Sequence, residues 1–164
     1  MSEEKNLRLN LTVKDVALTA IFAALYATLV YTFLPLSFYA LQFRFAGVLR
    51  PAIGKKWVLA IGYGIGVVAA NFFSPFGVWD LVFMPIVSLI AGLVGYLVAK
   101  RFNGNYFITG AIIATIVPIC LSWMLSIVAN APIMATLPYL LISEQAVCLI
   151  GALVFRTIDS RFKW

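Results

Sequence analysis

The 164-residue sequence contains no histidine, and its two cysteines, Cys120 and Cys148, each lie in an apolar stretch. Such a chain has too few soft ligands for a structural zinc site or an iron–sulfur cluster, so we expect no metal and no cofactor. It also lacks the Walker A, GxSxG and HExxH motifs. Neither ATP hydrolysis nor the familiar intramembrane hydrolases can therefore be assigned, and we expect no enzymatic activity.

Charge is also scarce. Only 11% of the residues are charged, whereas 63% are hydrophobic and the mean hydropathy is +1.02, which is far from the profile of a soluble domain. A membrane-spanning helix needs about 20 mostly apolar residues, so the chain has room for five or six spans and for no soluble domain. The polar first dozen residues and the absence of a cleavage site predict that the first apolar run remains as a helix.

Prolines, glycines and charged turns divide the apolar sequence into six segments. We predict an all-α integral membrane protein in which residues 1–164 form one domain, a compact bundle of six transmembrane helices. The predicted helices cover about residues 13–34, 39–53, 57–73, 79–99, 106–130 and 137–155. The charged segment after residue 155, RTIDSRFKW, is expected to be a tail.

The net charge of +6 comes from basic residues at the ends of the apolar runs, which indicates membrane topology rather than nucleic-acid binding. Lysines and arginines precede the first predicted helix and follow the second, fourth and sixth. The loops after the first, third and fifth helices contain none. The positive-inside rule then predicts that both termini lie in the cytoplasm. We expect a multi-pass protein of a prokaryotic plasma membrane.

Two arginines, Arg44 and Arg50, fall within the second predicted helix. A charge at the centre of a span costs about 2.5–3.5 kcal/mol on the lenient insertion scale, so each needs a partner. Arg50 is close enough to Lys55 and Lys56 to reach the cytoplasmic face, and this anchor role and an interior role are both open. Arg44 lies about 15 Å from that end in an α-helix and must face the interior.

Further costly polar side chains are expected at a similar depth, in the outer half of the bundle. Together they predict a polar cavity that opens outward and binds a small solute. The alternative is an Arg44–Glu144 or Arg44–Asp80 ion pair that only ties helices together. The predicted binding residues are Gln42, Arg44, Asn71, Trp79, Asp80, Asn130, Glu144 and Gln145.

A stripe of small residues at four-residue spacing marks the first predicted helix, where it allows another helix to approach closely. Either this stripe packs inside the bundle or it is a docking face for another membrane subunit. Its residues are Ala20, Ala23, Ala24 and Ala27.

The residues from Leu41 to Gly92 also carry a family resemblance. The run Gln42-Phe43-Arg44-Phe45-Ala46, the pair Ala70-Asn71 and the run SPFGVWDLVF over residues 74–83 resemble the QueT family. These proteins are substrate-binding S-components of energy-coupling factor (ECF) transporters. The alanine stripe is similar to the motif by which S-components dock on their coupling subunit.

The resemblance implies capture of a queuosine precursor, queuine or a related deazaguanine base, from outside the cell. Uptake would be ATP-driven, in a complex with the ECF transmembrane coupling subunit and two ABC ATPases. The sequence departs from the family at Gly47, where the family usually places a glutamate, so either the substrate differs from the usual one or Asp80 or Glu144 takes over that carboxylate's role. Trp79 would supply an aromatic face, and the polar residues would supply donors and acceptors to the base.

Other functions remain open at this point. The chain could be an S-component for another vitamin-like small molecule, or a structural or assembly subunit that binds no ligand. A small oligomeric exporter is disfavoured because the two halves show no convincing internal repeat.

Overall fold

The computed structural model describes residues 11–38 and 43–161 of the chain, and all regular structure in these ranges is helical. Gln42, one of the predicted binding residues, lies outside the described residues. The α-helices are α1 (Val13–Thr32), α2 (Leu34–Phe38), α3 (Val58–Ala70), α4 (Met84–Lys100), α5 (Tyr106–Val128) and α6 (Ile133–Arg161). A 3₁₀-helix, η1 (Phe45–Gly54), precedes α3, and a π-helix, η2 (Trp79–Phe83), leads directly into α4.

Local sequence explains where the helices begin and how closely they pack. Thr12 and Asp15 form a reciprocal capping box at the start of α1, and the side chain of Asn105 caps α5. Glycines bring α1 onto α3, because a Cβ at Gly66 would lie only 3.1 Å from the backbone oxygen of Ala23. The backbones of α1 and α3 therefore lie in close contact at this position.

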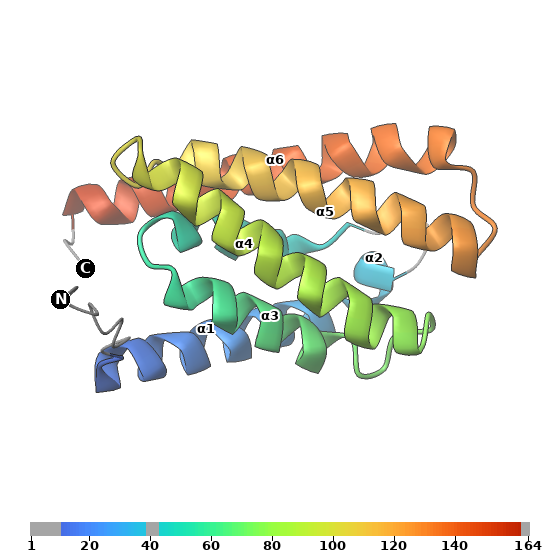
Figure 1. Ribbon diagram of the computed structural model, residues 1–164, viewed down its shortest axis with the longest axis horizontal. Coiled ribbons are helices and arrows are strands. Elements are labelled where there is room, and N and C mark those ends of the chain that lie inside the picture. Colours follow the sequence, from blue (N-terminus) through green and yellow to red (C-terminus); the bar gives the residue numbers. More distant parts are fainter. Residues whose placement is uncertain (1–10, 39–42, 162–164) are drawn as a thin grey trace, which may run out of the picture.

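The bundle is built around η1. Helices α1, α3, α4, α5 and α6 follow one another side by side, and all five contact η1 (Figure 1). Small residues make this possible, since Ala46, Gly47, Ala52 and Gly54 of η1 are all buried. A Cβ at Gly151 of α6 would collide with the backbone carbonyl of Val48, so α6 lies directly on the η1 backbone. Side chains of η1 therefore project into the interior of the protein.

Four helical segments are long and apolar enough to cross a membrane, namely α1, the continuous η2–α4 segment Trp79–Lys100, α5 and α6. The shorter apolar helices η1 and α3 bring the helical segments of ten or more described residues to six. Large apolar side chains such as Ile86, Ile90 and Leu97 are exposed along α4. A lipid environment would cover such a surface.

The predicted limits agree to within about three residues for α1, α3, η2–α4 and α5 and differ for two segments. A helix is predicted over residues 39–53, and the described part of this range, from residue 43, contains the 3₁₀-helix η1 rather than an α-helix. Pro51 lies within η1 and cannot donate the hydrogen bond that an α-helix interior requires. Helix α6 starts at Ile133 and continues to Arg161, so the expected tail is helical over most of its length.

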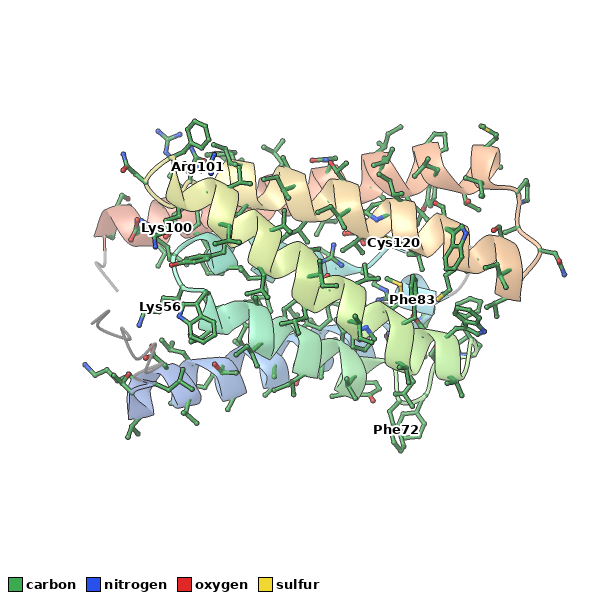
Figure 2. All side chains as sticks on the ribbon, in the orientation of Figure 1. Lys56, Phe72, Phe83, Lys100, Arg101 and Cys120 are labelled. Atoms are coloured by element: carbon green, nitrogen blue, oxygen red, sulfur yellow. The ribbon has the colours of Figure 1, made fainter. Side chains whose placement is uncertain are left out.

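Basic residues gather at one end of the bundle, where α1 begins and α6 ends. Figure 2 shows Lys56, Lys100 and Arg101 at this end. Two ion pairs tie it together, because Lys56 Nζ lies 3.2 Å from Asp15 Oδ1 and Lys55 Nζ lies 2.8 Å from Asp159 Oδ2. We call it the basic end.

Candidate functional site

The central position of η1 places both arginines of this segment inside the protein. Arg44, immediately before η1, is 3% exposed, and Arg50, within η1, is fully buried. The interpretation that Arg50 reaches the surface beside Lys55 is therefore wrong. A buried guanidinium group is destabilising unless a carboxylate and hydrogen-bonding groups surround it.

Arg44 pairs with Asp80, a fully buried residue of the π-helix η2. Its Nη2 lies 3.4 Å from each carboxylate oxygen of Asp80. Ser74 Oγ donates a hydrogen bond to Asp80 Oδ2 at 2.6 Å, and Asn71 Nδ2 donates to the backbone oxygen of Asp80 at 2.8 Å. The end of α3 and the following turn thus both bind Asp80 of η2, Asn71 through its backbone oxygen and Ser74 through its carboxylate.

Arg50 pairs with Glu144 of α6. Its Nη1 donates to Glu144 Oε2, and its Nη2 lies 3.4 Å from Glu144 Oε1 and 3.3 Å from the hydroxyl of Tyr26. The guanidinium carbon lies 5.4 Å from the centroid of the Tyr63 ring, in cation–π contact. The pair therefore joins η1 to α1, α3 and α6.

The two ion pairs are neighbours. Arg44 lies close enough to Tyr26 and Glu144, which contact Arg50, to interact with them electrostatically. We call this group the buried charge network. It consists of Arg44, Asp80, Arg50 and Glu144, with Tyr26, Asn71 and Ser74 bound to them.

Some polar atoms of the network have no hydrogen-bond partner among the described residues. Arg50 Nε, a donor, and Asn71 Oδ1, an acceptor, are both buried and lack such a partner. Leaving such a group unsatisfied costs about 1–3 kcal/mol, more for a charged one. These atoms can therefore supply hydrogen bonds to a polar ligand that enters the network.

Gly47 lies against the Arg50–Glu144 pair. A Cβ at this position would be 3.3 Å from Glu144 Oε2 and 3.3 Å from Arg50 Nη1, and 3.1 Å from a methyl group of Val147. Because Gly47 has no side chain, the Glu144 carboxylate fits beside its Cα. Position 47, where the sequence departs from the family pattern, therefore lies next to the carboxylate of Glu144.

Three of the predicted binding residues have their contacts elsewhere. Trp79 is 42% exposed, and its ring packs edge-on against Phe83 and Trp123. Asn130 is exposed in the turn after α5, where its φ is +51°. Gln145 Nε2 donates to the backbone oxygen of Ala111 at 3.2 Å and to Thr115 Oγ1 at 3.1 Å, so it joins α6 to α5.

The structure thus brings together Arg44, Asn71, Asp80 and Glu144 of the predicted set. It adds Arg50, Tyr26 and Ser74, to which the sequence had assigned no binding role. Ser74 and Asp80 lie six positions apart in the quoted run over residues 74–83, so the motif could have indicated their contact. Tyr26 lies between Ala23 and Ala27 on a helix whose composition suggests only apolar packing.

The alanine stripe of α1 has two faces. Ala23 and Ala27 are buried, and Ala23 packs against Gly66 of α3, whereas Ala20 and Ala24 are exposed. A groove of about 330 Å³ between α1 and α3 is lined by Ala20, Ala23, Val58, Ile61 and Ile65, among others. One half of the stripe therefore serves internal packing, and the other half remains on the surface.

Comparison with known proteins identifies the family. The family model described as the QueT transporter matches residues 16–160, a range that includes the whole buried charge network. The chain belongs to the QueT transporter family. The resemblance noted in the sequence is thereby confirmed, and the four membrane-length helices agree with a multi-pass transporter.

A curated relative extends this result. The QueT-family chain is 29% identical over 160 residues to the protein named Queuosine precursor transporter QueT of Lactococcus lactis subsp. cremoris (strain MG1363). The match covers 90% of this chain and 93% of that protein. No solved structure matches the chain significantly.

Proposed function

We propose that this chain is the substrate-binding S-component of an ECF-type ABC importer and that it captures a queuosine precursor, queuine or a related deazaguanine base. The name of the Lactococcus lactis relative supports the substrate class. The protein catalyses no reaction of its own in this proposal. Uptake is driven by two ABC ATPases through a transmembrane coupling subunit.

The buried charge network is the observation that carries the proposal. Four charged side chains are at most 3% exposed and come from η1 and the residue before it, from η2 and from α6. Charges inside a membrane protein are costly and commonly mark the path or site of a polar solute. Apolar residues of similar size would hold the same helices together at no electrostatic cost, so a purely structural role explains the network poorly.

The chemistry of the network suits a deazaguanine base. Asp80 and Glu144 can accept hydrogen bonds from amino and ring N–H groups, and either can pair with an aminomethyl cation. Arg50 and Asn71 can bind the base through Nε and Oδ1, which have no described partner. Tyr26 and Tyr63, whose rings meet edge to face at 5.2 Å, supply buried aromatic surface.

In this proposal the substrate binds charged side chains of the two ion pairs and replaces some of their present contacts with one another. Glu144 takes the role of the glutamate that the family places at position 47, because its carboxylate lies beside Gly47. Trp79, Asn130 and Gln145, whose described contacts lie outside the network, have lesser roles. The substrate enters from the end opposite the basic end.

The exposed half of the alanine stripe supports the docking part of the proposal. Ala20 and Ala24 lie on the surface, and Ala20 lines the groove between α1 and α3, so a helix of the coupling subunit can approach α1 closely here. The basic end faces the cytoplasm by the positive-inside rule, so both termini are cytoplasmic. The protein is then a multi-pass component of a prokaryotic plasma membrane.

The proposal is tested by ligand-induced thermal stabilisation of the purified protein. We expect queuine or its aminomethyl precursor to raise the melting temperature by mass action. Riboflavin and biotin, chemically distinct vitamins, serve as controls and should not do so. Stabilisation by riboflavin or biotin alone would refute the substrate class.

A further inference from the structure

A second polar cavity lies at the basic end, away from the buried charge network. Its volume is about 380 Å³. It opens to the surface and is lined by Lys55 immediately after η1, by Arg156 and Asp159 of α6 and by the turn from α4 to α5. Its charged lining residues are Lys55, Arg156 and Asp159.

The two cations are positioned at this cavity by aromatic rings. Lys55 Nζ lies 5.1 Å from the centroid of the Tyr106 ring, and the guanidinium carbon of Arg156 lies 5.9 Å from that of Phe107. Lys55 also pairs with Asp159, but its ammonium group has three donors and one carboxylate does not occupy them all. Arg156 forms no ion pair with a carboxylate of the described residues.

The cavity lies at the level of a membrane surface. Tyr106 is the first residue of one membrane-length helix, and Lys100 is the last residue of another. Phe102, which also lines the cavity, is 56% exposed. Aromatic side chains beside Lys and Arg at a span end are typical of the headgroup region. Lys100 and Arg101 lie at this end too, as Figure 2 shows, and add to its positive potential.

We propose that this cavity binds the phosphate group of an anionic phospholipid in the adjacent leaflet. Arg156 and Lys55 donate hydrogen bonds to the phosphate oxygens, while Phe102 lies against the start of the acyl chains. Basic pockets between transmembrane helices are well suited to anionic headgroups, and a nearby anionic surface attracts Lys and Arg. The bound lipid joins the end of η1 to α6, the two elements that carry Arg50 and Glu144.

Asp159 sets the affinity in this arrangement. Its negative charge lies 2.8 Å from Lys55 Nζ, where it offsets the attraction of that ammonium group for the phosphate and also repels the phosphate. Loss of the Asp159 charge should therefore strengthen anion binding, whereas loss of the Arg156 charge should weaken it. Opposite effects of two substitutions in one cavity distinguish a site from general loss of folding.

The test compares phosphatidylglycerol with phosphatidylcholine at equal concentration, added to the full-length protein in a neutral detergent. Native mass spectrometry counts bound lipid, and a thermal shift reports its affinity. We expect phosphatidylglycerol to bind and stabilise more than phosphatidylcholine. Arg156→Gln should weaken phosphatidylglycerol binding by about fivefold, Asp159→Asn should strengthen it, and Lys100→Gln, the same charge loss outside the cavity, should weaken it much less than Arg156→Gln does.

Three results would overturn the proposal. The first is equal binding of both lipids. The second is equal weakening by Lys100→Gln and Arg156→Gln, which would show diffuse attraction to a basic surface. The third is stabilisation by inorganic phosphate alone to the same extent, which would remove the lipid as the ligand.

Discussion

Removal of the Glu144 charge probes the interior electrostatics most sharply. In Glu144→Gln, the fully buried Arg50 faces a neutral side chain of similar shape in place of the Glu144 carboxylate. Breaking a buried pair by removal of one partner typically costs about 3–5 kcal/mol. Gln retains a carbonyl acceptor, so we expect a loss near 3 kcal/mol and a fall in melting temperature of about 6–12 °C.

Asp159→Asn is the matched control, since it makes the same chemical change in the Lys55–Asp159 pair. That pair is 27–30% exposed, so water replaces the lost partner and the expected loss is below about 1 kcal/mol. The assay is thermal unfolding in detergent without added lipid or ligand. Equal losses in the two variants would refute the claim that Arg50 and Glu144 interact in a low-dielectric interior.

Four further predictions concern other parts of the molecule. Gly47→Glu should destabilise the protein in thermal unfolding because its side chain meets the Glu144 carboxylate, and Glu144→Ala in the same chain should restore part of the loss; full stability of the single variant would contradict the packing. Trp at Ala20 and Ala24 should abolish uptake yet spare ligand binding by the purified protein, whereas Trp at Ala23 and Ala27 should impair folding itself, and equal effects would argue against a docking face. Gln145→Ala should lower the melting temperature slightly, through loss of its bonds to α5, without changing ligand affinity; a large affinity loss would return Gln145 to the site. A cysteine at Ser160, in a chain without Cys120 and Cys148, should react with impermeant reagents only in inverted vesicles, and labelling in intact cells would reverse the orientation.

The sequence predicts much of the helical framework because long apolar runs determine it locally. Helices α1 and α5 and the η2–α4 segment begin and end within a few residues of the predicted limits. The region before Gly54 was harder to predict, since Pro51 and several small residues favour a 3₁₀-helix that only the surrounding bundle stabilises. The contacts of η1 with five helices are tertiary contacts, so the local sequence pattern does not reveal them.

The pairing of the buried charges was likewise only partly predictable from the sequence. Scarcity of charge indicates that Arg44 needs a partner, and Asp80, with which it pairs, is one of the two carboxylates named for an ion pair. The proximity of Arg50 to Lys55 suggested a route to the surface, but the helices packed around η1 close that route. Trp79 precedes Asp80 in the chain and yet packs against Trp123, because adjacent residues of a helix point in different directions.

The double variant Arg50→Met with Glu144→Leu tests the central claim most directly. Replacement of both partners of a buried ion pair by apolar residues is often neutral or stabilising, so this variant should fold with a melting temperature close to that of the wild type. The measurement is the thermal shift that queuine induces in each protein. We predict stabilisation of the wild type and none of the folded double variant; an equal shift in both would contradict a substrate-binding role for the buried charge network.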